Sequence, residues 1–298
     1  MSSSAAISLS PSREASVRPD GWEALLELVL APRGDRTRIS ARRHFGPLVV
    51  QRALYPEGDL CHVVLLHPPG GMVGHDRLTT DVTCSPDAQA LVTTPGANKV
   101  YLNLDRPVRQ TQTLRVEAGA CLEWLPQPLI VFDGAHAELD TRIELADDAA
   151  FIGWDAICLG RPAIGEAFSD GRLRQRLRLG RASGDSLYEE YWQLDGGDRA
   201  LHAPWGLAGR SVLATLFAYP ADDALLEQAR HAVSDVGNGD GATAQSTAVG
   251  CSLLDHLLVA RVLADGAEPA FAALEQLWRA LREATVGRVP VRPRIWST

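Results

Sequence analysis

Residues 90–154 repeat one short template three times, as Ala90-Leu-Val-Thr-Thr94, Ala120-Cys-Leu-Glu-Trp124 and Ala150-Phe-Ile-Gly-Trp154. Each copy has a small residue, two apolar residues, a variable position and then Thr or Trp, and the copies begin at positions 90, 120 and 150. A fixed period of this size is typical of stacked β units, each covering the apolar face of its neighbour. We therefore expect a mainly β fold of stacked strand layers, such as a β-helix. The alternative is that the repeat is a chance match to a degenerate template.

The first copy lies in the stretch His67–Asn103, HPPGGMVGHDRLTTDVTCSPDAQALVTTPGANKVYLN. Its opening Pro and Gly residues can continue neither a helix nor a central strand, so they predict a tight turn. The alternating run 78–83 predicts a half-buried strand, and 88–94 a return strand after the turn at 85–87. A polar, glycine-rich turn held by apolar strands is a common place for function.

Length and composition restrict the class of protein. The chain has 298 residues, 46% of them hydrophobic, which suits a globular protein with a core. No segment approaches the roughly 20 apolar residues of a membrane helix, so we expect no membrane partner. The formal net charge of −8 argues against a nucleic-acid partner. Five cysteines without a C-x-x-C pair indicate a reducing cytoplasm.

The chain divides by composition into three parts. Residues 1–20 are Ser-rich and lack an apolar signal core, which predicts a disordered tail. Residues 21–220 read as a β-rich domain. Residues 221–298 read as a helical C-terminal part packed on it, ending in an extended tail at 287–298. Helical spacing places its helices at Asp222–Val233, Gln245–Ala264 and Glu268–Thr285.

The segment Gly171–Gly180 alternates Arg with apolar residues. In a strand its four arginines face one side, and Leu173, Leu177 and Leu179 face the other. One interpretation is an edge or surface strand whose charge prevents unwanted pairing. The other is a docking stripe for an acidic partner.

Searches for catalytic motifs mostly fail. The sequence has no G-x-G-x-x-G, P-loop, H-E-x-x-H or G-x-S-x-G motif. Asp235–Gly241 resembles a calcium loop, but it lacks the carboxylates at both key positions. The pair His75-Asp76 could hold a metal or cap a turn. Carboxylates among apolar strands could line a wet interior passage or simply point outward.

The motifs taken together resemble the family of urease accessory proteins called UreD, or UreH in some systems. The resemblance covers about residues 22–298, and it rests on Gly70-Gly71-x-x-Gly74-His75-Asp76-Arg77-Leu78, Leu91-x-Thr93-Thr94-Pro95-Gly96-Ala97-x-Lys99, Gln110-Thr111-Gln112, Leu122-Glu123-Trp124-Leu125-Pro126-Gln127-Pro128, Phe132-x-Gly134-Ala135, Trp154-Asp155-x-x-x-x-Gly160-Arg161-Pro162, Gly165-Glu166-x-Phe168, Leu258-Val259-x-Arg261-Val262-Leu263, Leu277-Trp278-x-x-Leu281-Arg282 and Pro293-Arg294-Ile295-Trp296. Two positions depart from the family pattern. His75 stands where the family has glycine, and Pro128 where it often has glutamate.

The resemblance implies a non-enzymatic urease maturation factor with β layers followed by helices. Such proteins bind the urease apoprotein and, through an adapter (UreF), a GTPase (UreG), and they offer nickel a polar internal passage. No tightly bound cofactor is implied, only nickel in transit. Oxygen and imidazole groups are suitable nickel ligands, and a passage should bind the ion weakly.

The candidate site residues follow from the matching motifs and their apolar flanks. We expect transient nickel contacts at Asp76, Glu123, Asp155 and Glu166, with passage lining by Thr93 and Thr94. We expect the C-terminal elements to dock the adapter through residues 290–298, with Arg294 and Trp296 in contact. Core anchoring is the alternative for Trp296.

Two other classes of function stay open. One is a metal-dependent hydrolase using His67, His75 and Asp76, which would bind metal tightly and stoichiometrically. The other is a β-rich interaction scaffold without a metal role, which would assemble with partners regardless of its carboxylates.

Overall fold

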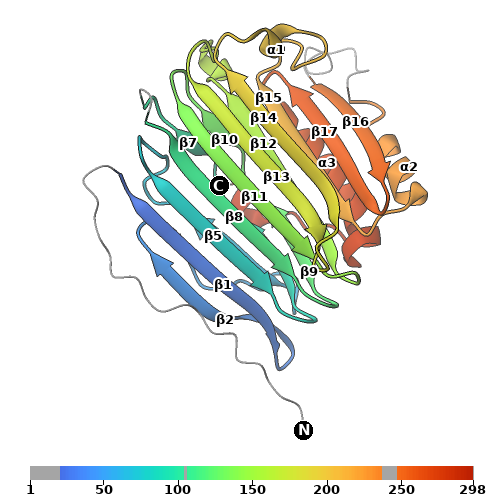
Figure 1. Cartoon of the computed structure of the whole chain (residues 1–298). Helices are drawn as coiled ribbons and strands as arrows, with labels where there is room; N and C mark the ends of the chain where they lie inside the picture. Colours follow the sequence, from blue (N-terminus) through green and yellow to red (C-terminus); the bar gives the residue numbers. More distant parts are fainter. Residues whose placement is uncertain (1–20, 104–105, 237–246, 298) are drawn as a thin grey trace.

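The computed structural model of the chain describes residues 21–103, 106–236 and 247–297. The predicted disordered tail, residues 1–20, lies outside the described residues. Two β-sheets pack face to face, and helices cover the outer face of one of them (Figure 1). The fold is therefore mainly β with stacked layers and a C-terminal helix, as the repeat predicts.

One sheet has seven strands in the order β14-β13-β11-β8-β5-β1-β2. Its strands are β1 (Glu23–Arg33), β2 (Arg36–Phe45), β5 (Arg77–Cys84), β8 (Val108–Val116), β11 (His136–Leu145), β13 (Arg172–Arg181) and β14 (Ser186–Asp195). Its middle strands β5, β8, β11 and β13 run parallel.

The ten-stranded sheet has the order β16-β17-β15-β12-β9-β6-β4-β3. The two remaining strands lie outside this order: β10 pairs with β12 and with β7. Its strands are β3 (Val49–Val50), β4 (Cys61–Leu66), β6 (Gln89–Thr93), β7 (Asn98–Val100), β9 (Cys121–Leu125), β10 (Leu129–Val131), β12 (Ala150–Leu159), β15 (Val212–Tyr219), β16 (Thr247–Leu254) and β17 (Leu257–Ala264).

The chain alternates between the two sheets and so winds as a coil. Strands β4, β6, β9 and β12 lie parallel in one sheet, and β5, β8, β11 and β13 lie parallel in the other. The repeat copies are thus neighbours, although Ala90 pairs with Leu122 and Leu122 with Phe151, so the register departs from 30 by one or two residues. Residues 89–93 form a strand as predicted, but the prediction that this strand returns beside the preceding one is wrong. The turn at Ser85–Ala88 leads into the other sheet, so β6 does not pair with β5.

Alternation along the strands builds two hydrophobic cores. Leu26, Val82, Leu114 and Phe151 belong to the core between the sheets. The opposite face of the ten-stranded sheet is also apolar and packs on the helices, as at Leu216. The ten-stranded sheet is therefore buried on both faces.

Two helices form this outer layer. Helix α2 (Asp223–Ala232) begins after Asp222, whose Oδ1 accepts a hydrogen bond from the Leu225 N–H at 2.9 Å. Helix α3 (Ala267–Val286) ends at Gly287, which has φ +71°. These helices confirm the predictions at 222–233 and 268–285. The shorter elements are η1 (Pro162–Ile164), α1 (Arg199–His202) and η3 (Arg294–Ser297).

The helix predicted over Gln245–Ala264 is wrong. Strands β16 and β17 form an antiparallel hairpin there, which turns at Asp255 with φ +53°. Strand β17 is buried on both faces, so apart from Arg261 its residues are apolar at every phase and match a helical template as well as a strand. The hairpin extends the ten-stranded sheet past residue 220; the division into parts 21–220 and 221–298 stays a prediction.

The interpretation of 171–180 as an edge or surface strand is wrong as to the edge and right as to the surface. Strand β13 lies inside the seven-stranded sheet, between β11 and β14. Its arginines point outward, while Leu173, Leu177 and Leu179 are buried, as the alternation predicts.

Candidate functional site

Two proline-containing segments interrupt the ten-stranded sheet at the same level. Residues 94–97 (Thr-Pro-Gly-Ala) separate β6 from β7, and residues 126–128 (Pro-Gln-Pro) separate β9 from β10. Proline has no N–H to donate, so neither ladder can continue. The Gln127 N–H instead donates to Thr94 Oγ1 at 2.8 Å, which holds the two segments together.

Behind this interruption a cavity of about 290 Å³ lies between the two sheets. It is far larger than the about 10–15 Å³ that one water molecule needs. The inward positions that line it include the apolar residues Leu78, Leu129 and Leu139, but nine of its 21 lining residues are polar. These are His67, Thr80, Thr94, Asn98, Gln110, Gln112, Gln127, Thr141 and Asp155. The wall therefore presents hydroxyl, amide and imidazole groups and a single carboxylate.

Asp155 provides that carboxylate from the inward face of β12. The Gln175 side-chain amide donates a hydrogen bond to it from the opposite sheet. Burial raises the pKa of Asp155 to about 6, even though hydrogen bonds from the Ala156 backbone and Gln175 act in the opposite direction. The group is therefore mostly ionised at pH 7 and mostly protonated at pH 5.

A polar row continues from Asp155 toward the edge of the sandwich. Asp155 lies beside Thr215, and Thr215 lies beside Arg261 in the strand register. Arg261 reaches across to β14, donating to Tyr188 Oη at 2.9 Å and to the Glu190 carboxylate. The interior between the sheets thus carries a connected polar band inside two apolar walls.

Glu123 lies on the other face of the sheet. Its neighbours Leu122 and Trp124 point into the inter-sheet core, so Glu123 points toward α3. There it accepts hydrogen bonds from Trp278 Nε1 at 2.7 Å and from Arg282, whose guanidinium also contacts Glu57 at 2.7 Å. Glu123 and Arg282 are fully buried. The contacts make Glu123 part of a charged clamp between sheet and helix, and the cavity lining does not include it.

Thr93 and Thr94 point to opposite faces, as consecutive strand residues do. Thr94 lines the cavity. Thr93 Oγ1 instead donates to the Leu125 carbonyl at 2.6 Å and accepts from Trp296 Nε1 at 2.8 Å, under the helical layer.

Asp76 and Glu166 lie in the loops that lead from one sheet to the other. The Asp76 carboxylate accepts hydrogen bonds from the backbone N–H groups of Trp22 and Val73, both at 2.8 Å, so it caps its turn. Glu166 pairs with Arg161, whose hydrogen bond holds the pKa of Glu166 below its usual range. Neither carboxylate belongs to the cavity lining.

The three residues of the hydrolase hypothesis have separate roles in the structure. His67 lines the cavity, its Nδ1 lies 3.4 Å from Asn98 Oδ1, and burial lowers its pKa. His75 has the left-handed φ of +68° in the turn that Asp76 caps. Among the described residues no group of three or more His, Cys, Asp or Glu side chains is placed to hold a metal ion.

The C-terminal candidates differ from each other. Trp296 is partly buried, and its ring lies 5.1 Å from that of Phe271, 5.7 Å from that of Trp278 and 5.8 Å from that of Trp154. Arg294 is exposed. The geometry therefore favours anchoring for Trp296 and leaves Arg294 accessible to a partner.

Sequence reasoning missed most of the cavity wall. Gln112, Thr80 and Thr141 are consecutive neighbours across β5, β8 and β11, and Thr141 Oγ1 lies 3.2 Å from Gln112 Oε1. The signal was available in β8, where Gln110 and Gln112 occupy the same phase as the core residues Val108 and Leu114. A polar pair at core phase in a strand marks a hydrated interior.

Two further observations concern the chain as a whole. All five cysteines are free thiols. In residues 21–103, 106–236 and 247–297, the helices are too short or too polar to cross a membrane.

Comparison with known proteins assigns the chain to a family. The model of the UreD urease accessory protein family matches residues 23–297. The chain is 49% identical to the urease accessory protein UreD of Pseudomonas aeruginosa PAO1 over 278 residues, covering 93% of this chain and 95% of the relative. It is 44% identical to UreD of Alkalilimnicola ehrlichii (97% and 96% covered) and 42% identical to UreD of Pseudomonas putida W619 (96% and 98% covered). With a family match over nearly its whole length, the chain belongs to the UreD family of urease accessory proteins.

Proposed function

We propose that this protein is a non-enzymatic urease maturation factor that binds apo-urease and guides nickel through the cavity between its two sheets. The adapter (UreF) and the GTPase (UreG) are its proposed further partners, and the cytoplasm its proposed location. The nine polar side chains in the cavity wall carry the proposal, because the surrounding core between the sheets is apolar. Family membership supports the urease connection.

The composition of the cavity wall suits transit better than storage. Amide, hydroxyl and neutral imidazole groups can replace water around a divalent cation, but they bind it weakly. Asp155 is the single carboxylate in the lining, and at pH 7 its charge would attract the ion without the second anion that a tight site needs. Protonation of Asp155 would remove that attraction, so transfer should slow below about pH 6.

A first experiment tests the function as a whole. The chain is co-purified with the urease subunits and the two other accessory proteins, and urease activity is then measured after nickel is added. Activity that requires this chain supports the maturation role. A chain that neither joins the complex nor changes activation contradicts it. Assembly with normal activation by every cavity variant favours the metal-independent scaffold, and tight stoichiometric nickel binding by the isolated protein favours the hydrolase.

A second experiment separates the cavity from the surrounding carboxylates. We expect Asp155→Leu to remove most of the nickel-dependent activation while the complex still forms, because it takes the charge out of the wall. Glu166→Leu is the matched control, since Glu166 pairs with Arg161 outside the cavity. Equal loss in both variants, or in neither, contradicts the assignment of Asp155 to the passage.

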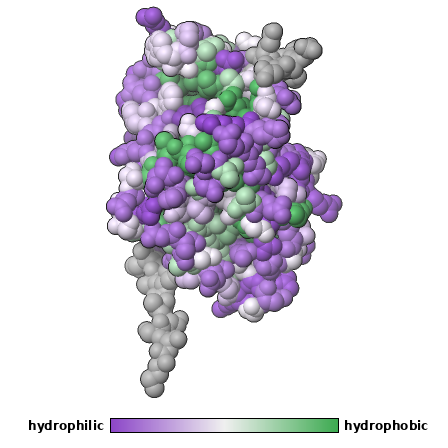
Figure 2. Space-filling view, turned by 90° about the vertical axis from the view of Figure 1, so that its right-hand side faces the viewer, coloured by the Kyte–Doolittle hydropathy of each residue, from purple (hydrophilic) through white to green (hydrophobic). Residues whose placement is uncertain are grey.

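The C-terminal elements are a proposed docking site for the adapter. The side of the molecule that carries α2 and β16 is mostly hydrophilic, but hydrophobic areas interrupt it (Figure 2). Removing residues 288–298 should weaken adapter capture, but it also removes the packed Trp296. Arg294→Glu avoids this problem because its side chain is exposed. Unchanged capture by both variants counts against docking there.

A further inference from the structure

The outer face of the seven-stranded sheet is unusually rich in charge. On β5, β8, β11, β13 and β14 the inward positions are apolar or polar, apart from the charged Glu190, whereas the outward positions are mostly charged. The outward arginines are Arg77, Arg109, Arg115, Arg142, Arg172, Arg174, Arg176 and Arg178, and the outward carboxylates are Asp81, Glu138, Asp140, Glu144, Glu189 and Asp195. On these five strands, eight arginines face outward against six carboxylates, so this part of the face is positive on a chain whose net charge is −8.

The ion pairs on this face leave its arginines accessible. Glu138 forms ion pairs with both Arg109 and Arg174, and Glu144 forms ion pairs with both Arg115 and Arg142. The Arg174–Glu138 contact is long, at 3.7 Å. Exposed pairs of this kind contribute less than about 1 kcal/mol each, so a partner carboxylate can share or replace them at little cost.

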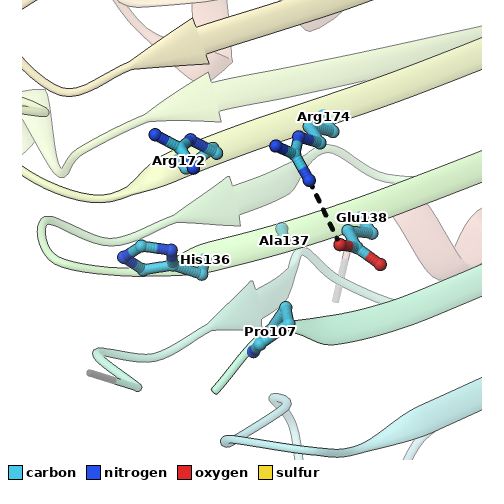
Figure 3. A pocket seen from close by; sticks show the side chains of 6 residues that line it. All are labelled: Pro107, His136, Ala137, Glu138, Arg172 and Arg174. Atoms are coloured by element: carbon cyan, nitrogen blue, oxygen red, sulfur yellow. Dashed lines mark ion pairs between the residues drawn. The ribbon is translucent and has the colours of Figure 1, made fainter. Parts of the chain in front are cut away.

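The face is hollowed at one point. A pocket of about 200 Å³ lies between β8, β11 and β13, lined by Pro107, His136, Ala137, Glu138, Arg172 and Arg174. Figure 3 shows His136, Arg172 and Arg174 standing up from two adjacent strands on the same side of the ribbon, with the Arg174–Glu138 ion pair at one rim. Two guanidinium groups, an imidazole and the Glu138 carboxylate thus surround a hollow of side-chain size, and Arg172 also forms an exposed ion pair with Asp195.

We propose that this pocket receives a carboxylate from an acidic segment of a protein partner that lies across the outer face of the seven-stranded sheet. Guanidinium groups bind carboxylates through paired N–H donors, and Arg and Tyr are enriched at protein interfaces. Tyr191 fits this description, because it is 61% exposed and lies beside Arg176 on the same face. The inference does not depend on the nickel passage, which lies on the inner side of the sheet.

A protein partner suits the face better than a nucleic acid does. Six carboxylates are distributed among the arginines, and each would repel a phosphate backbone. An acidic peptide can instead place a few carboxylates against individual arginines and avoid the acidic positions. The proposal therefore commits to an acidic protein segment.

The test uses three probes with the purified full-length chain: a glutamate-rich peptide, a glutamine peptide of the same length, and a single-stranded oligonucleotide. We expect the glutamate peptide to bind, its affinity to fall with added salt, and the glutamine peptide to bind far more weakly. Arg172→Glu and Arg174→Glu should each weaken binding by about tenfold, as loss of one close charge pair does. Both side chains lie on an exposed face, so the variants should fold, which circular dichroism checks.

Arg230→Glu is the matched control, because Arg230 is similarly exposed on α2 and also pairs with a glutamate one helical turn away. It should leave peptide binding unchanged. Absence of binding to the glutamate peptide overturns the proposal, as does an equal loss in Arg230→Glu. Tighter binding of the oligonucleotide than of the peptide overturns the choice of a protein partner.

Discussion

The buried clamp between the ten-stranded sheet and α3 can be broken at one residue. Arg282→Met removes the guanidinium that contacts Glu123 at 2.8 Å and Glu57 at 2.7 Å, but it retains much of the side-chain volume. Arg282 and Glu123 have fully buried side chains, and Glu57 is only 7% exposed. In the variant, His62 still contacts Glu57 and Trp278 still donates to Glu123, so each carboxylate keeps one partner.

The expected loss of stability follows from the contacts that Glu57 and Glu123 lose. Removing one partner of a buried ion pair costs about 3–5 kcal/mol, because it leaves an uncompensated charge in a medium of low polarity. The remaining hydrogen bonds place the expected loss toward the lower end of this range, at about 3 kcal/mol. That is a large fraction of the roughly 5–15 kcal/mol by which a typical protein is stable.

Urea unfolding followed by tryptophan fluorescence measures the loss, because Trp278 lies at the clamp. The control is Arg279→Met on the same helix. Arg279 is exposed, and its partner Glu275 keeps a second ion pair with Arg292, so the variant should lose less than about 1 kcal/mol. The triple variant Arg282→Met/Glu57→Gln/Glu123→Gln should recover much of the stability, since it removes the stranded charges. If Arg282→Met is no less stable than Arg279→Met, the clamp is not a stabilising element and our assignment of Glu123 is wrong.

Three further predictions concern single residues. Asp155→Asn should be more stable than the wild type at pH 7.5 by up to about 3 kcal/mol and equal to it at pH 4. The folded-state pKa of Asp155 is raised to about 6, so stability that is present below pH 3.8 is lost as the pH rises through 6. Urea unfolding at the two pH values measures the difference, and a difference that is independent of pH contradicts the prediction. Asp76→Ala should lower the free energy of unfolding by about 1–3 kcal/mol, because two backbone N–H groups lose their acceptor. Calorimetry should show unchanged nickel binding by the isolated protein. A loss of nickel binding would support a metal site at this turn. Trp296→Ala should lower the free energy of unfolding by about 2–4 kcal/mol, because aromatic packing is lost. The loss is measured as a lower urea midpoint. An unchanged midpoint would show that Trp296 does not anchor the C-terminus.

The repeat at positions 90, 120 and 150 was enough to predict the coil, because the copies lie on neighbouring parallel strands of successive turns, within one or two residues of exact register. The hairpin β16–β17 could not be predicted from the same kind of pattern. Its second strand has helices on one face and the inter-sheet core on the other, and burial on both sides removes the two-residue alternation that distinguishes a strand.

The candidate site shows the same limit at the level of single side chains. Glu123 and Asp155 both stand among apolar residues, but one points toward α3 and the other into the cavity. In a sheet buried on both faces, apolar flanks do not reveal which way a polar residue points. Thr93 and Thr94 were predicted together, and strand geometry necessarily separates them.

The central claim is that nickel crosses the cavity between the sheets, and occluding that cavity tests it most directly. Thr141 lines the cavity from β11 and is nearly buried, so Thr141→Met would project a longer apolar side chain into the space. Thr141→Val removes the same hydroxyl at almost the same volume and serves as the control. We measure the rate of nickel-dependent urease activation by complexes containing each variant, after confirming that both fold and assemble. We expect a strongly reduced rate for Thr141→Met and a rate near that of the wild type for Thr141→Val. Wild-type activation by an assembled Thr141→Met complex would contradict it.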